Sequence, residues 1–281
     1  MKIFHKAAEL KNYLKDVRNS SVSIGFVPTM GALHQGHVSL FEAAKRENEV
    51  TVGSIFVNPL QFNNATDLEK YPRKINDDIR VLESTGCDVV FIPENEEMYP
   101  AAPVTTMSFG ALETVMEGKF RPGHFSGVGI VVSKLFNIVQ PHKAYFGQKD
   151  LQQFLIIKQM VRDLSFPLQL VCCPTLREED GLAMSSRNLR IPPEKRPIAS
   201  EIYKSLLIAR DALKSESVEN VKTRVKNYMA GFPDLELEYF EIADGETLLP
   251  IENISNQKNI ALCIAAYLSG IRLIDNILLI S

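Results

Sequence analysis

Two histidines, His34 and His37, follow a glycine-containing turn and are the residues of this sequence best placed to do chemistry. They are three residues apart, so they share one face of a helix that begins near them. The apolar run 22–27 predicts a buried strand before the turn, and the amphipathic run after residue 38 predicts the helix. Such a junction presents unpaired backbone N–H groups and the positive end of a helix dipole, which favour phosphate. We therefore expect the imidazoles to donate hydrogen bonds to phosphate oxygens.

The two glycines of this turn, Gly31 and Gly36, have the spacing of a Walker A loop, but the following residues do not fit that motif. His37 and Val38 stand where the motif needs lysine followed by serine or threonine, and the sequence contains no G-x-G-x-x-G fingerprint. A kinase-like phosphate loop is therefore disfavoured. A surface or capping role for each histidine stays open. Metal binding is disfavoured, because no third ligand lies nearby at suitable spacing.

A second junction of the same kind follows the apolar segment 143–146. There Gly147 leads through Lys149 into a predicted helix, and the lysine can act as a point charge on a phosphate. Asp150 and Gln153 have the spacing of a helix-capping pair, which is an alternative to a ligand contact for both. Asp150 could instead help to hold a magnesium ion on the phosphates.

Three further segments carry polar residues that could meet a ligand. Gln61 lies in a loop after the apolar run 50–57, where parallel sheets bind ligands, although an ordinary loop residue is the alternative. Arg121 and His124 lie in the segment 118–127, whose three glycines and proline predict an irregular loop, and they could contact phosphate or solvent. The segment 184–188 offers two hydroxyls and a guanidinium, or a helix N-cap.

The elements that must position these residues divide into two groups. Apolar runs alternating with helical periods predict an α/β domain with a parallel sheet up to about residue 175. The charged run 177–181 then predicts a hinge, and a small helix-plus-antiparallel-sheet domain follows it. We expect helices over 7–17, 73–85, 128–139, 198–213 and 218–228, and strands over 22–27, 50–57, 88–93, 104–109, 143–146, 166–171, 235–242, 259–268 and 271–280.

Composition narrows the class of protein. The chain has 281 residues, 45% of them hydrophobic, and 31 basic against 34 acidic residues give a net charge of −3. No basic run is present, so a nucleic-acid partner is disfavoured. No apolar run is long enough to span a membrane, and we expect no membrane partner. The four cysteines form no C-x-x-C pair and are expected to be reduced thiols of a cytoplasmic protein.

Taken together, five segments in this order resemble the pantothenate synthetase family, the ligases that join pantoate to beta-alanine with ATP. A single segment would be weak evidence for this resemblance. Five segments in the family's order, spread over most of the chain, are strong evidence for it. They are Pro28-Thr29-Met30-Gly31 with His34-Gln35-Gly36-His37, Asn58-Pro59-Leu60-Gln61-Phe62, Arg121-Pro122-Gly123-His124-Phe125, Gly147-Gln148-Lys149-Asp150 with Gln153, and Asp180-Gly181-Leu182-Ala183-Met184-Ser185-Ser186-Arg187-Asn188.

The resemblance implies a Rossmann-like nucleotidyltransferase domain over residues 1–175 and a small C-terminal lid domain over 176–281. It also implies a cytoplasmic homodimer whose substrates are pantoate, beta-alanine and ATP, used with Mg²⁺. Pantoate would attack the α-phosphorus of ATP to give pantoyl adenylate and pyrophosphate, and beta-alanine would then displace AMP. A permanent nucleotidyltransferase, a tRNA synthetase relative and a nucleotide-sensing module without turnover stay open as alternatives.

The resemblance also assigns roles to individual residues. His37 would be catalytic, and pantoate would contact Gln61 and Gln153, with Gln61 also implied for beta-alanine. The residues available to donate to the reacting phosphates are His34, His37, Lys149, Ser185, Ser186 and Arg187. The implied ATP contacts are Met30, Gly31, Ala32, Leu33, His34, Gln35, Gly36, His37, Gly147, Gln148, Lys149, Asp150, Leu176 through its backbone, Met184, Ser185, Ser186 and Arg187.

Overall fold

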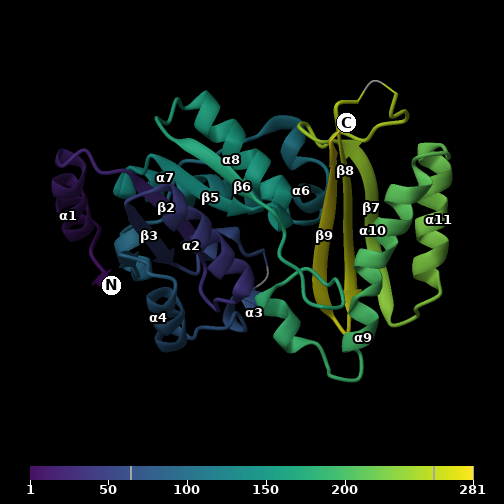
Figure 1. Ribbon diagram of the computed structural model, residues 1–281, viewed down its shortest axis with the longest axis horizontal. Coiled ribbons are helices and arrows are strands. Elements are labelled where there is room, and N and C mark those ends of the chain that lie inside the picture. The colour runs from purple at the N-terminus through teal and green to yellow at the C-terminus, as the bar shows by residue number, and fades with distance from the viewer. Residues whose placement is uncertain (64, 256, 281) are drawn as a thin grey trace.

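The computed structural model describes residues 1–63, 65–255 and 257–280 and contains two β-sheets flanked by helices (Figure 1). The first sheet has six parallel strands in the spatial order β1-β4-β3-β2-β5-β6, and the second has three antiparallel strands in the order β7-β8-β9. The predicted fold class, an α/β parallel sheet followed by a small antiparallel sheet, is confirmed. The strands are β1 (Lys2–Phe4), β2 (Ile24–Thr29), β3 (Val50–Ile55), β4 (Val89–Phe91), β5 (Lys143–Gly147), β6 (Gln169–Cys173), β7 (Leu235–Asp244), β8 (Asn259–Leu268) and β9 (Ile271–Ile280).

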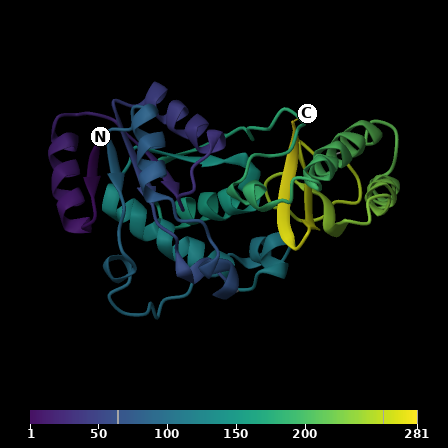
Figure 2. The same ribbon diagram turned by 90° about the horizontal axis from the view of Figure 1, so that it is seen from below.

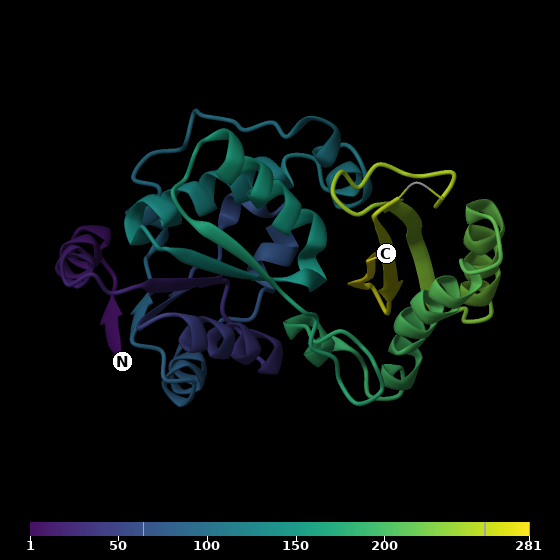
Figure 3. The ribbon, with the colours of Figure 1, turned by 45° about the horizontal axis from the view of Figure 1, so that its top comes forward.

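Helices cover both faces of the parallel sheet, as Figure 3 shows, and two separate cores result. Helices α1, α7 and α8 pack on one face, and α2 and α4 pack on the other. Successive strand residues alternate between the cores: Phe26 lies in the first and Val27 in the second. The buried strands therefore contain continuous apolar runs. The helices and 3₁₀ turns are α1 (Ala7–Asn19), α2 (Gln35–Glu47), η1 (Pro59–Gln61), α3 (Ala65–Glu69), α4 (Ile75–Ser84), α5 (Asn95–Met98), η2 (Gly110–Glu113), α6 (Met116–Phe120), α7 (His124–Val139), η3 (Gln148–Asp150), α8 (Leu151–Asp163), η4 (Ser186–Arg190), α9 (Arg196–Ala199), α10 (Glu201–Ala212) and α11 (Val218–Ala230).

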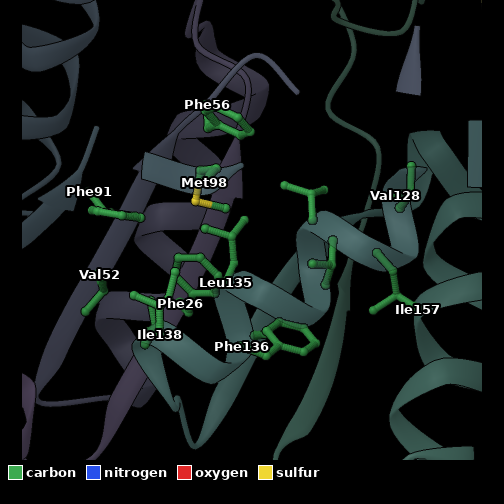
Figure 4. Close-up of a cluster of buried hydrophobic side chains, with 14 of the residues drawn as sticks. Phe26, Val52, Phe56, Phe91, Met98, Val128, Leu135, Phe136, Ile138 and Ile157 are labelled. Carbon is green, nitrogen blue, oxygen red and sulfur yellow. The ribbon is translucent and has the colours of Figure 1, made fainter. Parts of the chain in front are cut away.

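The larger of these cores is centred on α7. Figure 4 shows Phe26 and Val52 of the sheet beside Leu135 and Phe136 of this helix, with Met98 close to them. The apolar stripe predicted for residues 128–139 faces this core, so that part of the helix is packing rather than chemistry.

The order in which the chain adds strands to the sheet changes direction at β2, although all the strands run parallel. The chain passes from β2 through α2 to β3 on one side, whereas β5 pairs with β2 on the other side. Parallel sheets bind ligands at the carboxyl ends of the strands at such a switch point. The turns after β2 and β5, which carry the predicted phosphate-binding residues, therefore lie side by side there.

Three local predictions are wrong, wholly or in part. Residues 104–109 form no strand: Val104 is 98% exposed, while Met107 and Phe109 pack against the core of the first sheet. The segment 118–127 is not an irregular loop, because α6 ends at Phe120 and α7 begins at His124. Its glycines serve close packing: a Cβ on Gly118 would lie 2.1 Å from the Glu113 carbonyl oxygen, and one on Gly127 would lie 2.3 Å from that of Leu60. The loop predicted around Gln61 after the run 50–57 also contains regular structure, because η1 (Pro59–Gln61) and α3 (Ala65–Glu69) lie there.

The second sheet has its own core, formed with α10 and α11, and is joined to the first unit by a smaller shared cluster. Met116, Leu151 and Leu155 from the first unit pack there against Ala261 and Cys263 of β8. Figures 1 and 2 show the antiparallel sheet at one end of the parallel sheet, with α10 and α11 on its outer side. The predicted strands 259–268 and 271–280 pair as an antiparallel hairpin, whose turn at Ser269 and Gly270 has positive φ at both residues. No helix among the residues that the structure describes is long and apolar enough to cross a bilayer.

Candidate active site

A cavity of about 250 Å³ lies where the two strand–turn–helix junctions meet the antiparallel sheet. Residues from both junctions line it, together with Gln61 and residues 184–187. The structure thus brings together the segments that the sequence predicted to converge. Five of the predicted ATP contacts do not line the cavity: Gly31, Ala32, Leu33, Gln35 and Gln148.

His34 and His37 form a reciprocal cap at the N-terminus of α2. The His34 ring accepts from the Gly36 N–H through Nδ1 (3.1 Å), and His37 Nδ1 accepts from the His34 N–H (3.2 Å). Burial lowers the pKa of His34 to about 4 and that of His37 to about 3; Lys149 adds to both shifts, and the His34 ring adds to that of His37. Both rings are therefore neutral near pH 7, with the proton on Nε2. The capping role and the donor role are thus compatible, since each ring keeps one N–H donor.

The turn 30–33 is held by Asp78 of α4, a residue that the sequence reasoning missed. Its carboxylate accepts from the N–H groups of Ala32 (3.0 Å) and Leu33 (2.7 Å), and it is only 2% exposed. Burial raises the pKa of Asp78, and the two N–H bonds oppose that shift. The expectation that this junction presents unpaired amides is therefore wrong for Ala32 and Leu33. Gly31 adopts φ +82°, which suits glycine, and allows the turn to approach Asp78.

Gln61 also lines the cavity and is held by four neighbours, one of them Met30, whose sulfur accepts from Gln61 Nε2 at 3.1 Å. Its Oε1 accepts from Asn58 Nδ2 (3.1 Å), and its backbone carbonyl accepts from His124 Nδ1 (2.8 Å). His124 is 4% exposed, and burial lowers its pKa to about 4, so it is neutral. It positions the backbone of Gln61 rather than lying in solvent. Arg121 Nη2 also donates to this carbonyl, at 3.4 Å.

The second junction places Lys149, Asp150 and Gln153 on the cavity wall. Asp150 precedes α8, but its side chain makes no capping hydrogen bond, so the capping alternative for Asp150 and Gln153 is not supported. The turn is held from the antiparallel sheet instead: Asn276 of β9 donates to the carbonyls of Gln148 (3.0 Å) and Lys149 (2.9 Å). Lys149 Nζ lies 3.6 Å from Asp150.

The segment 184–187 completes the wall. Ser185 caps the 3₁₀ turn η4, its Oγ accepting from the Arg187 N–H at 3.3 Å, as the N-cap alternative predicted. Arg187 pairs with Asp67 of α3 at 3.2 Å. The Leu176 carbonyl accepts from the Met184 N–H, which ties this segment to the strand that leaves the first sheet.

The charged run 177–181, predicted as a hinge, is fixed by ion pairs. Arg177 binds both carboxylate oxygens of Asp275 on β9, at 2.6 and 3.0 Å, and stacks on the Tyr203 ring at 3.7 Å. Glu178 and Asp180 both pair with Arg196. Within the described parts of the chain, no three His, Cys, Asp or Glu side chains are grouped as metal ligands.

A family model for pantoate-beta-alanine ligase matches residues 2–278. The chain belongs to the pantoate-beta-alanine ligase family. A pantothenate synthetase of Cytophaga hutchinsonii is 48% identical over 274 residues, 97% of each chain, and one of Bacteroides fragilis is 48% identical over 277 residues, 99% of this chain and 98% of that one.

Solved structures of other members resemble this ligase along its whole length. The pantothenate synthetase of Thermus thermophilus has a TM-score of 0.92 at 43% identity, with 99% of both chains covered. The pantoate-beta-alanine ligase of Francisella tularensis, complexed with beta-gamma ATP and beta-alanine, has a TM-score of 0.80 at 37% identity, with 99% of this chain and 97% of that chain covered.

Sequence reasoning about this ligase missed the residues that hold others in place. Asn58 stood in one of the quoted segments without a role, and Asp78 lay in an ordinary amphipathic helix. Asp275 and Asn276 did carry a signal, because these two adjacent polar residues interrupt the apolar run 273–280 of a predicted strand. Polar residues in a buried strand need partners, and these two bind Arg177 and the Gln148–Lys149 turn.

Proposed function

We propose that this ligase condenses pantoate with beta-alanine through a pantoyl adenylate and releases pyrophosphate and AMP. Family membership supports the overall reaction. The observation that supports its ATP-dependent chemistry best is the meeting of two strand–turn–helix junctions and the segment 184–187 around one cavity.

In the first step, a pantoate carboxylate oxygen bonds to the α-phosphorus of ATP, and the bond from that phosphorus to the bridging oxygen breaks. Charge grows on the non-bridging oxygens and on the leaving pyrophosphate. We assign the Nε2–H groups of His34 and His37 to these oxygens, together with Lys149, Ser185, Ser186 and Arg187. His37 is the catalytic residue in this proposal. Neutral imidazoles suit the role, because Nδ1 of each ring accepts within the cap and Nε2–H remains as the donor of each ring.

Pantoate is assigned to Gln61 and Gln153. An amide orients a carboxylate without neutralising it, so the nucleophile keeps its reactivity. In the second step the amine of beta-alanine attacks the acyl carbon, the bond from that carbon to the AMP oxygen breaks, and the amine loses a proton. We also assign Gln61 to beta-alanine, since its position is fixed by Asn58 and His124.

The nucleotide is assigned to the segments 30–37, 147–150 and 184–187, with a backbone contact at Leu176. Because the Ala32 and Leu33 amides are already bonded to Asp78, their contribution is to shape the turn rather than to donate to phosphate. Mg²⁺ would accompany ATP and offset phosphate charge. The Asp150 carboxylate fits such an ion, because it is 51% exposed, lines the cavity and makes no capping bond.

We propose that residues 1–175 and 176–281 act as separate domains, the second closing as a lid that protects the adenylate from water. The ion pairs of residues 177–180 would then guide the closure. Solution scattering with ATP and pantoate should show compaction, and unchanged dimensions would contradict the lid.

We also propose a homodimer in the cytoplasm, and the unpaired cysteines suit a reducing compartment.

The test is to measure pyrophosphate, AMP and pantothenate while each substrate is omitted in turn. Pantoate and ATP alone should release pyrophosphate up to the amount of enzyme, and AMP and pantothenate should appear only after beta-alanine is added. A nucleotide that stays on the product would indicate a permanent nucleotidyltransferase. A protein that binds ATP without releasing pyrophosphate would be a sensing module.

A further inference from the structure

Two arginines, Arg272 and Arg121, share the carboxylate of Glu117 but differ in how fully their N–H groups are used. Arg272 of β9 donates to both oxygens of Glu117, at 2.7 and 2.6 Å, and to Glu238 through Nε (2.9 Å) and Nη2 (2.5 Å). The Tyr239 hydroxyl donates to Glu117 Oε1 at 2.9 Å. Glu117 is therefore largely satisfied by the antiparallel sheet. Burial opposes its ionisation, but Arg272 outweighs burial and holds the pKa of Glu117 below its ordinary value.

Arg121 is left with weak partners. Its closest approach to Glu117 is 3.6 Å, which is long for a hydrogen bond, and its contact with the Gln61 carbonyl is 3.4 Å. The side chain is only 23% exposed and lines the cavity. A guanidinium carries five N–H donors, and a buried one without close acceptors is poised to bind an anion. Burial accordingly lowers the pKa of Arg121 from its ordinary value.

The chemistry of the reaction indicates which anion this is. Three Lys or Arg side chains among the described residues line the cavity, and the other two, Lys149 and Arg187, lie in the segments assigned to ATP. The carboxylate of pantoate is the nucleophile, and a paired guanidinium would reduce its reactivity. The carboxylate of beta-alanine does not react and persists in the product, so its burial requires a cation. Arg121 lies beside Gln61, the residue assigned to both acids.

We propose that Arg121 binds the carboxylate of beta-alanine, and that Arg272 is a positioning residue that keeps Glu117 from capturing Arg121. This inference rests on the proposed function and adds the residue that selects an amino acid over a neutral amine. The antiparallel sheet thereby contributes to substrate choice without contacting the reacting atoms.

The test compares beta-alanine with beta-alaninamide, its neutral carboxamide, in the wild-type protein and in Arg121→Gln and Arg121→Lys. The wild type should prefer beta-alanine by about a hundredfold in kcat/KM, the scale of leaving one partner of a buried ion pair unpaired. Arg121→Gln should raise the KM for beta-alanine by about the same factor and reduce the preference to a few-fold. Arg121→Lys keeps the positive charge but cannot donate two parallel hydrogen bonds to a carboxylate. Its preference for beta-alanine should therefore lie between those of the wild type and Arg121→Gln.

The half-reaction without beta-alanine is the internal control. Pyrophosphate release from ATP and pantoate should fall far less than kcat/KM for beta-alanine in both variants, because this half-reaction loses only the long 3.4 Å contact with the Gln61 carbonyl, and its persistence also verifies their fold. Arg162→Gln, at a side chain 72% exposed on α8, is the matched arginine control and should change nothing. If Arg121→Gln does not fold, Arg121→Lys carries the comparison.

Two results would overturn the inference. One is an equal loss for beta-alanine and its carboxamide. The other is a higher KM for pantoate with slower pyrophosphate release, which would assign Arg121 to the other acid. Failure of the wild type to release pyrophosphate would instead contradict the proposed function itself, so the two failures are distinguishable.

The role of Arg272 has its own readout. Arg272→Met should raise the KM for beta-alanine, because Glu117 then pairs with Arg121. Adding Glu117→Gln to that variant removes the competing carboxylate and should restore the KM toward wild type. A purely structural role for Arg272 predicts no such rescue, and its absence would overturn this part of the proposal.

Discussion

The two strand–turn–helix junctions of the cavity are similar in sequence pattern but are stabilised in different ways. The junction after β2 is held within the first unit, by the reciprocal histidine cap and by Asp78 on α4. The junction after β5 is held by Asn276 from the antiparallel sheet, more than a hundred residues later in the chain. The position of the first junction is thus set by residues of the first unit. The position of the second junction depends on where the antiparallel sheet lies. We infer that closure of the C-terminal residues would adjust the second junction against a fixed first one.

The largest effect should come from the chemistry of the first junction. His37→Ala removes one preorganised donor and should slow adenylate formation by about a hundredfold or more. Single-turnover pyrophosphate release with saturating ATP and pantoate measures this step. A rate equal to wild type would refute the assignment of His37.

The next effect tests whether the first junction depends on its local clamp. Asp78→Ala leaves two buried amides unpaired, so it should lower the free energy of unfolding by about 3 kcal/mol and slow adenylation about tenfold. Urea denaturation and single-turnover kinetics measure the two effects. Asp77→Ala, at the adjacent residue with a side chain 62% exposed, should change neither. If the two variants have the same stability and the same adenylation rate, the turn 30–33 keeps its conformation without Asp78.

On the second junction, Gln153→Ala should raise the KM for pantoate by about tenfold while the KM for ATP stays unchanged. The expected size is that of one lost hydrogen bond to a charged group. Equal increases for both substrates would instead indicate a structural role at the start of α8.

A smaller effect should follow from the remote clamp. Asn276→Ala removes three hydrogen bonds to the turn that carries Lys149, so we expect the KM for ATP to rise about fivefold and the free energy of unfolding to fall by about 1–3 kcal/mol. Asn137→Ala, whose side chain is exposed and bonds only within α7, is the control. An unchanged KM for ATP would mean that the second junction, like the first, is set locally.

The smallest effect concerns pH. His34 and His37 have folded-state pKa values of about 4 and 3, below the ordinary value near 6.5. Between those values the unfolded chain binds more protons, so their contribution to stability is present above pH 6.5 and is lost as the pH falls toward 4. Urea denaturation of the wild type should show a steeper decline over this range than a His34→Asn, His37→Asn variant. Identical slopes would contradict the neutral cap.

Sequence reasoning predicted the parallel sheet and the segments around the cavity because both depend on local patterns. Buried parallel strands contain continuous apolar runs, and a strand that enters a helix through glycine is visible in sequence. Asp78 and Asn58 could not be assigned in this way, because a single polar residue acquires its role only when a distant segment packs against it, and the Asp275–Asn276 pair signalled buried partners without indicating which. The prediction of a loop over 118–127 was wrong for a related reason. Glycine suits both tight turns and close helix contacts, and only the packing of the folded chain determines which of the two forms.

At Gly127 the structure depends on the absence of a side chain. Its α-carbon lies so close to the Leu60 carbonyl that one additional methyl group would displace the short turn that ends in Gln61. Alanine there would add no charge and remove no polar group, yet it would alter the shape of the cavity wall around Gln61. A programme to enlarge or narrow the range of acids accepted by this ligase should therefore begin with the steric contact between α7 and that turn, before any polar side chain is exchanged.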